Sequence, residues 1–157
     1  VSAAQRDRVL DFIRQGIAAG GELLAGSADR PAFDKGYFVA PTVLVVARDN
    51  PLAHEEIFGP VLVILPYTDE ADAVALANDT IYGLGGGVWS TDEAHAIAVA
   101  RRIKTGQVDI NGGPFNARAP FGGYKQSGNG RENGTYGFEE FLEFKALQLK
   151  PAPAPAA

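Results

Sequence analysis

Apolar residues recur every three to four positions at the start of the chain, which is the spacing of an amphipathic helix. Ser2 and Gln5 form a capping box before this pattern, and Gly20–Gly21 ends it. We therefore expect a helix from about Ala3 to Ala19. The apolar positions on its buried face are Val9, Phe12, Ile13 and Ile17.

Short apolar segments follow this helix and alternate with helical patterns. Val61–Tyr67 is an uninterrupted apolar run, and such runs are typical of central strands that are covered on both faces. Thr68 is expected to cap a helix over Asp69–Asn78, and Ser90 with Glu93 forms a capping box before the next helix. The alternation predicts an α/β fold with a mostly parallel sheet and flanking helices. The expected strands cover residues 23–25, 38–46, 61–67, 85–89 and 107–110.

The last third of the chain has less regular patterning. Residues 111–137 are rich in glycine and show no periodicity, which is typical of a long structured loop that serves a site. Residues 138–143 predict a short helical turn, and residues 145–150 alternate as a strand does. The proline- and alanine-rich tail, residues 151–157, is expected to be extended and disordered.

Composition narrows the class of protein. The chain has 157 residues, of which 46% are hydrophobic and 21% charged, so it can form one globular domain. A net charge of −5 without a basic stripe argues against nucleic acid or an anionic membrane as the partner. The longest apolar runs are far shorter than the roughly 20 residues of a membrane-spanning helix. Because the chain has no cysteine, we expect no disulfide framework and a cytoplasmic location.

Three motifs suggest metal or phosphate binding, but none of them meets the requirements of such a site. His54–Phe58 begins like a zinc-protease helix, yet Phe58 occupies the position of the second histidine, so we expect no metal site. Gly123–Gly128 has the spacing of a P-loop without its lysine, and Gly128–Asn133 neither follows a strand nor opens a long helix. From its chemistry alone, Glu56 fits a ligand contact and an exposed surface position equally well.

Four motifs in a fixed order are more specific than composition. They are GYFVAPTV (Gly36–Val43), HEEIFGPV (His54–Val61), ANDTIYGL (Ala77–Leu84) and APFGGYKQSGNGRENGTYG (Ala119–Gly137). Together they resemble the C-terminal portion of the NAD(P)-dependent aldehyde dehydrogenase superfamily, over about Val1 to Lys150. The resemblance implies part of a catalytic domain over residues 1–137 and a short helix with an oligomerisation strand over residues 138–150, before the tail at 151–157.

The resemblance also implies a reaction. In that superfamily a cysteine thiolate attacks an aldehyde, hydride passes to NAD or NADP, and a water activated by a glutamate hydrolyses the thioester to a carboxylic acid. The matching places the cysteine, the glutamate, the oxyanion-hole asparagine and most of the cofactor-binding fold before Val1. It therefore implies that the isolated chain is inactive and that it contributes no catalytic residue apart from a proton relay at Glu132.

Several residues of this chain match site residues of the superfamily. Glu56 would accept hydrogen bonds from the nicotinamide ribose, and Phe58 would pack beside the nicotinamide ring. Gln5 and Arg8 resemble helix residues near the cofactor ribose. The cofactor is NAD or NADP, bound mainly outside this chain.

The glycine-rich loop supplies the matches on the substrate side. Asn111, Phe115 and Phe121 match residues of the aldehyde pocket, and Glu132 matches an acid proposed to relay protons toward solvent. The residues themselves leave alternatives open, because the two phenylalanines could pack within the loop and Glu132 could pair with Arg131.

The end of the chain matches a strand that crosses to a neighbouring subunit. This implies a homo-oligomer, a dimer or a tetramer, that pairs through Lys145–Lys150. Two other functions stay open: a free-standing, truncated association module without catalysis, and a phosphate-activated reductase of the same superfamily. Pro114 and Asn133–Thr135 depart from the usual motif, so the aldehyde is undetermined.

Overall fold

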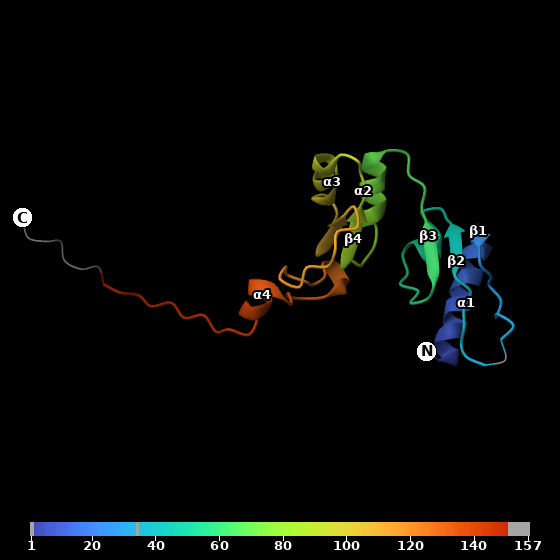
Figure 1. The fold of residues 1–157 in the computed structure, drawn as a ribbon, viewed down its shortest axis with the longest axis horizontal. Coiled ribbons are helices and arrows are strands. Elements are labelled where there is room, and N and C mark those ends of the chain that lie inside the picture. The colour runs from blue at the N-terminus through green and yellow to red at the C-terminus, as the bar shows by residue number, and fades with distance from the viewer. Residues whose placement is uncertain (1, 34, 151–157) are drawn as a thin grey trace, which may run out of the picture.

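The computed structural model describes residues 2–33 and 35–150, and its elements form two parts and an extension (Figure 1). The N-terminal part, residues 2–66, contains α1 (Ala3–Ala18), β1 (Glu22–Ala25), β2 (Thr42–Val45), the 3-10 turn η1 (Pro51–Ala53) and β3 (Val61–Ile64). The second part, residues 67–140, contains α2 (Glu70–Asn78), β4 (Gly85–Val88), α3 (Glu93–Ala100), β5 (Gln107–Ile110), the 3-10 turn η2 (Lys125–Ser127) and α4 (Gly134–Glu139). The C-terminal extension is residues 141–150.

The strands form two separate sheets. In the N-terminal part β2 lies between β1, which is antiparallel to it, and β3, which is parallel to it. In the second part β4 and β5 pair in parallel across the α3 connection. The predicted mixed α/β class is therefore confirmed, and two of its three strand pairings are parallel. The strands do not form one layer, however, because β3 and β4 have no pairing with each other.

The prediction that the apolar run at Val61 forms a central strand is wrong for this chain. β3 is an edge strand, and its side chains alternate between half-buried Val61 and Val63 and more exposed neighbours. Leu62 is 59% exposed and Ile64 is 38% exposed. The middle strand is β2, where Leu44 is fully buried.

A compact apolar cluster holds the N-terminal part together by packing α1 against the sheet. Asn50 stabilises this contact, because its side chain donates to Gly16 O (2.9 Å) and accepts from Leu52 N (3.0 Å). Gly16 is required there, because a Cβ at this position would lie 2.1 Å from a methyl of Leu52. The buried cluster consists of Val9, Leu10, Ile13, Leu44, Val46, Leu52 and Ile57.

The helix caps agree with the sequence only in part. Ser2 caps α1 by accepting from Gln5 N (3.2 Å), as expected. The cap of α2 is Asp69 rather than Thr68, and the cap of α3 is Asp92 rather than Ser90. In both cases a neighbouring aspartate, a strong N-cap residue, lies one or two positions closer to the first helical turn.

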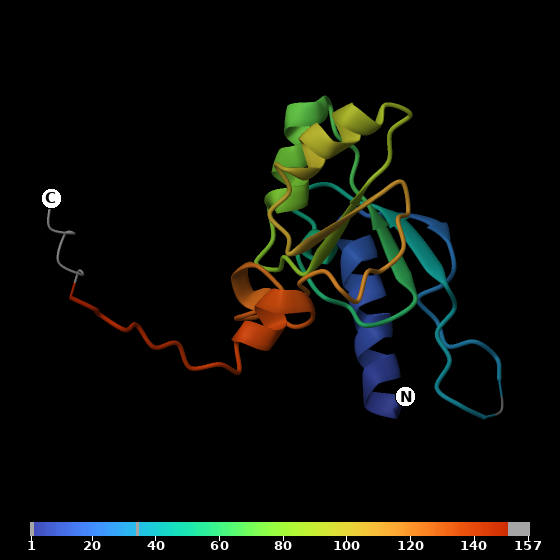
Figure 2. The ribbon, with the colours of Figure 1, turned by 60° about the vertical axis from the view of Figure 1, so that its left-hand side comes forward.

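Close backbone contacts join three segments of the second part. Gly83 O accepts from Gly106 N (3.0 Å) and from Tyr124 N (2.8 Å), so one carbonyl joins segments near residues 83, 106 and 124. A Cβ at Gly106 would lie 1.6 Å from Gly122 O, which shows that the backbones touch. α2 and α3 lie side by side against β4 and β5 (Figures 1 and 2).

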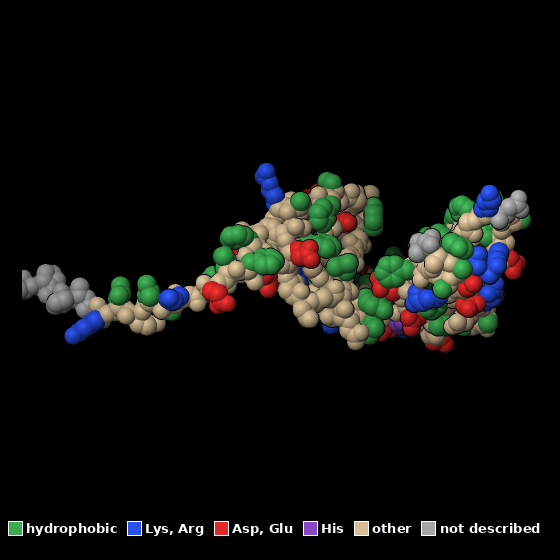
Figure 3. All heavy atoms as spheres, turned by 90° about the horizontal axis from the view of Figure 1, so that it is seen from below, with side chains coloured by type: hydrophobic (Ala, Val, Ile, Leu, Met, Phe, Trp, Pro, Cys, Tyr) green, Lys and Arg blue, Asp and Glu red, His purple; other side chains and the backbone are tan. Residues whose placement is uncertain are grey.

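The C-terminal end departs from the prediction. The short helix α4 begins at Gly134 rather than at Phe138 and ends at Glu139. Residues 145–150, predicted as a strand, have no strand partner in the described chain and run outward as an exposed extension with apolar side chains along it (Figures 1 and 3). A strand needs a partner for its backbone groups, so its formation in an oligomer stays a prediction. The predicted disorder of residues 151–157 lies outside the described residues.

The chain exposes more surface than a compact domain of its size, and many large apolar side chains are among the exposed residues. The accessible surface is 11335 Å², whereas a compact chain of this size would expose about 7,500 Å². None of the helices in the described residues has the length and apolar character needed to cross a membrane.

Candidate functional site

Helix α1 holds the loop at residues 54–60 in place. The Gln5 side chain donates to Phe58 O (3.1 Å) and to Ile57 O (3.4 Å). The Arg8 guanidinium donates to Ile57 O (3.3 Å) and to Glu56 O (3.4 Å), and it lies over the ring of Phe12. Gln5 and Arg8, expected near the cofactor ribose, therefore contact the backbone of the loop that carries Glu56 and Phe58.

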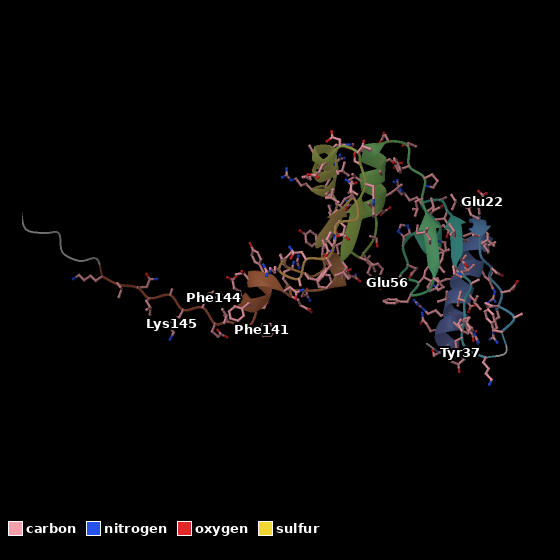
Figure 4. The ribbon with its side chains drawn as sticks, in the orientation of Figure 1. Glu22, Tyr37, Glu56, Phe141, Phe144 and Lys145 are labelled. Atoms are coloured by element: carbon pink, nitrogen blue, oxygen red, sulfur yellow. The ribbon has the colours of Figure 1, made fainter. Side chains whose placement is uncertain are left out.

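The loop turns Glu56 and Phe58 outward because the residue between them is buried. Ile57 is 8% exposed and belongs to the apolar cluster, whereas Phe58 is 73% exposed. Phe58 has a φ of 53°, a conformation that is rare for an aromatic residue and is often found at functional sites. Glu56 lies on the side of the N-terminal part that faces the second part (Figure 4).

A cleft of about 430 Å³ separates the two parts at this point. His54, Glu55 and Glu56 line one wall, and Thr80, Tyr82, Leu84 and Ser127 are among the residues of the other. Polar groups and apolar side chains both face this space, as is typical of small-molecule sites. The cleft brings the predicted cofactor-side loop next to the base of the glycine-rich loop.

The glycine-rich loop brings three of the predicted site residues together. The rings of Phe115 and Phe121 meet edge to face, with centroids 5.7 Å apart. Phe121 and Glu132 exchange two backbone hydrogen bonds, Phe121 N to Glu132 O (2.8 Å) and Glu132 N to Phe121 O (2.6 Å). Phe121 and Glu132 also line a cavity of about 270 Å³. The structure thus places the phenylalanines in contact with each other while leaving Phe115 58% exposed.

Glu132 does not form the ion pair that its neighbour made possible. Nη1 of Arg131 donates to Gly130 O (2.6 Å) and Gly123 O (3.2 Å), and the guanidinium lies 5.3 Å from the centroid of the Tyr124 ring. Within the described chain no ion pair joins Arg131 to Glu132. The carboxylate of Glu132 is left exposed at the surface of the loop.

Asn111 has a local structural role. Its side chain accepts from Ser90 N (2.9 Å) and donates to Ser90 O (3.0 Å), and its φ is 51°. These bonds join the ends of β4 and β5. Both polar groups of the Asn111 side chain are therefore bound to Ser90, and the structure does not bring them to the aromatic pair.

Two side chains that the sequence did not single out as site residues are His54, which lines the cleft, and Lys125, which contacts the turn at residues 78–80. The ring nitrogens of His54 lie 2.9 Å from Asp79 O and 2.8 Å from Arg48 O. Lys125 Nζ donates to Asn78 O and Thr80 O, each at 2.9 Å. The acceptors of Lys125 are backbone carbonyls, and the sequence carries no signal for such a contact.

A separate charged cluster joins α2 to α3. Glu70 accepts from His95, and this hydrogen bond, together with one from Arg102, holds the pKa of the Glu70 carboxyl below its usual value. This cluster borders an apolar cavity of about 450 Å³ between the helices and β4. Nowhere in residues 2–33 and 35–150 do three His, Cys, Asp or Glu side chains gather as metal ligands would.

Known proteins are similar to this chain in sequence and in fold. The aldehyde dehydrogenase family matches residues 1–147. A 3-succinoylsemialdehyde-pyridine dehydrogenase of a Pseudomonas species is 52% identical over 93% of this chain and 31% of its own length. A putative aldehyde dehydrogenase of Staphylococcus saprophyticus is 48% identical over 94% of this chain and 31% of its own length.

Solved structures give the same result. The Mycobacterium tuberculosis aldehyde dehydrogenase complexed with NAD+ is 49% identical and superposes with a TM-score of 0.85, covering 89% of this chain and 29% of that one. The Streptococcus pyogenes succinic semialdehyde dehydrogenase in complex with NADP+ is 40% identical, with a TM-score of 0.87, over 96% of this chain and 33% of that one. This chain thus spans about a third of the length of these relatives, and it belongs to the aldehyde dehydrogenase family.

Proposed function

We propose that this chain forms the cofactor-facing and substrate-facing walls of an NAD(P)-dependent aldehyde dehydrogenase that oxidises an aldehyde to a carboxylic acid. It would correspond to the C-terminal portion of the enzyme and complete a catalytic domain whose reactive groups lie elsewhere. The observation that carries the proposal is the loop at residues 54–60, which α1 holds so that Glu56 lines the cleft and the ring of Phe58 is exposed.

The exposed groups of this loop fit a nicotinamide nucleoside. Glu56 offers an exposed carboxylate, and a carboxylate is a strong hydrogen-bond acceptor for the two hydroxyls of a ribose. Phe58 offers a 73% exposed ring that can cover one face of a flat heterocycle. One similar structure was solved with NAD+ and another with NADP+, so we assign NAD(P) to this chain without choosing between the two.

The chain's own residues would bind, orient and shield the reactants. When bound, NAD(P)+ accepts the hydride that leaves the aldehyde carbon. Phe115 and Phe121 would cover the aldehyde and exclude water from it, while Glu132 would carry protons from the site to solvent. The chain has no cysteine, so the thiolate that forms the thioester must come from outside these residues.

The C-terminal extension favours a second role in association. Phe141, Phe144, Leu147 and Leu149 are each more than 75% exposed, and the extension is drawn away from the rest of the chain (Figure 3). Lys145–Lys150 would pair with the sheet edge of a second subunit and so cover these side chains. The same surface would also serve a non-catalytic association module, and enzymatic activity distinguishes the two.

The test of this function uses the product of the complete reading frame that contains these residues. NAD(P)+ reduction should accompany oxidation of an aldehyde such as propanal, and Glu56→Gln should lower kcat/KM by about tenfold to a hundredfold because the ribose is held less well. Glu22→Gln is the matched control, because Glu22 lies on β1 away from the cleft (Figure 4). Equal kinetics for Glu56→Gln and the wild type would remove Glu56 from the site.

The 157-residue chain by itself should show no aldehyde oxidation with NAD+ or NADP+. Turnover by this chain alone would contradict the requirement for a cysteine from outside it. The free-standing association module is favoured instead if the complete reading frame also lacks activity but the chain self-associates in analytical ultracentrifugation.

A further inference from the structure

Three consecutive carbonyls at the end of α2 accept hydrogen bonds from side chains of two other loops. Lys125 Nζ donates to Asn78 O and Thr80 O, each at 2.9 Å. Between these two carbonyls, Asp79 O lies 2.9 Å from Nδ1 of His54. One turn, residues 78–80, therefore contacts the loop of Glu56 and the loop of Phe121.

The chemistry of a helix end explains why hydrogen-bond donors bind there. The last carbonyls of a helix have no intrahelical donor, and the helix dipole places partial negative charge on them. His54 has carbonyl oxygens at both ring nitrogens, because Nε2 lies 2.8 Å from Arg48 O. The side chains of Arg48 and Asp79 also lie close to each other, with Nε and Oδ2 4.0 Å apart.

Backbone bonds extend the contact along the glycine-rich loop. Gln126 N donates to Ile81 O (3.0 Å), and Gly83 N donates to Ser127 Oγ (2.9 Å). The Asn78 side chain adds a brace, because it donates to Arg102 O (2.9 Å) and accepts from Lys104 N (2.7 Å). The segment after α3 thus fixes the turn through Asn78, while the carbonyls of the turn bind the two loops.

We propose that the turn at residues 78–80 is the common anchor that fixes the cofactor-side loop relative to the substrate-side loop, with His54 and Lys125 as its positioning residues. The proposal rests on the function proposed above. Neither side chain needs to touch the reactants. His54 acts through Glu56, two positions along its own loop, and Lys125 acts through Phe121 and Glu132, which flank it in the other loop.

The test separates the two loops kinetically in the product of the complete reading frame. Lys125→Met should raise KM for the aldehyde and lower kcat by about tenfold or more, because it loosens the substrate side. His54→Gln should act mainly on KM for NAD(P)+. Lys125→Arg should restore most of the activity, because a guanidinium can donate to both carbonyls.

Matched controls remove the same chemical groups nearby. Lys104→Met removes an ammonium at a residue whose backbone N–H, rather than its side chain, bonds Asn78. His95→Gln removes an imidazole that contacts Glu70 instead of the turn. Both should leave the two KM values near wild type, and a loss equal to that of Lys125→Met would overturn the specific role.

A double-mutant cycle and hydrogen exchange complete the test. Because both side chains hold one turn, the losses from Lys125→Met and His54→Gln should be non-additive.

Wild-type kinetics in both single variants of an active enzyme would overturn the anchor but leave the proposed function standing. If the wild type itself is inactive, the proposed function fails, and the anchor is judged by amide exchange. Faster exchange at Tyr124 and Gln126 in Lys125→Met supports the anchor, and unchanged exchange refutes it.

Discussion

The two parts of this chain contain similar elements but are stabilised differently. In the N-terminal part α1 covers β2, and seven buried apolar residues form a continuous cluster. In the second part Val74 and Ala96 are the buried apolar residues, and three segments meet at backbone distance around Gly83 and Gly106. Burial of apolar surface thus dominates in the first part, whereas close glycine contacts and hydrogen bonds to backbone carbonyls dominate in the second.

The difference also shows at the surface. Trp89 is 71% exposed and Ile81 is 52% exposed, so the second part presents large side chains that its own small core does not cover. The anchor at residues 78–80 lies in this part, where hydrogen bonds rather than a core hold the loops. A site wall of this kind depends on the exact geometry of a few carbonyls.

The largest effect should come from a methyl group at the glycine contact. In Gly106→Ala the new Cβ would meet the backbone oxygen of Gly122 at 1.6 Å, which no side-chain rotation can relieve. We expect the second part to lose about 4 kcal/mol of its free energy of unfolding, measured by urea denaturation. Amide exchange should accelerate in β5 and remain slow in β2.

Gly85→Ala is the control for this variant, since a Cβ at Gly85 meets nothing within 4 Å. It should be close to neutral. Equal losses in Gly106→Ala and Gly85→Ala would show that the glycine contact does not hold the second part together.

A cavity in the N-terminal cluster should have the next largest effect. Leu10 is 1% exposed between α1 and the sheet, so Leu10→Ala should lower the free energy of unfolding by about 3 kcal/mol. Urea denaturation measures the loss, and amide exchange should accelerate in β2 before β5. Leu24→Ala, at a leucine that is 53% exposed, should cost much less. Accelerated exchange in β5 alone would reverse the comparison between the parts.

The smallest effect on stability should come from lowering the pH. The pKa of Glu70 is lowered in the folded chain, first by its hydrogen bond from His95 and then by that from Arg102. The stabilisation is therefore complete above the ordinary glutamate pKa of about 4.3 and is lost as the pH falls through the lower, folded-state value. Tm measured between neutral and acidic pH should fall less steeply in Glu70→Gln than in wild type, with Glu22→Gln as the control. Identical slopes in wild type and Glu70→Gln would remove this carboxylate from the acid response.

Local patterns predicted the elements of this fold well. The apolar spacing around Val9 and Ile13 gave α1, and short runs gave all five strands to within a few residues. The alternation also gave the α/β class. Some errors concerned helix caps, where Asp69 and Asp92 take the place of the predicted Thr68 and Ser90 because each lies closer to the first helical turn.

From the sequence, the residues of the candidate site could be predicted only where they lie in specific motifs. Glu56, Phe58, Phe121 and Glu132 could be selected from the sequence because their motifs are specific, and their roles stay predictions. Asn111 could not be judged, since its pairing with Ser90 depends on two strand ends that meet only in the folded chain. The sequence did not reveal the partners of His54 and Lys125, because these partners are backbone carbonyls, which every residue carries.

The sequence by itself predicted α1, α2, α3 and the five short strands, showed that the chain has no cysteine, and contained the motifs that resemble aldehyde dehydrogenases. These properties depend on spacing and side-chain chemistry within short stretches. Only the tertiary structure decided that β3 is an edge strand, that the sheet is divided in two, and that the turn at residues 78–80 contacts both loops. Those features depend on which distant backbone groups pair, and the side-chain pattern along a single stretch does not specify a partner for a backbone carbonyl.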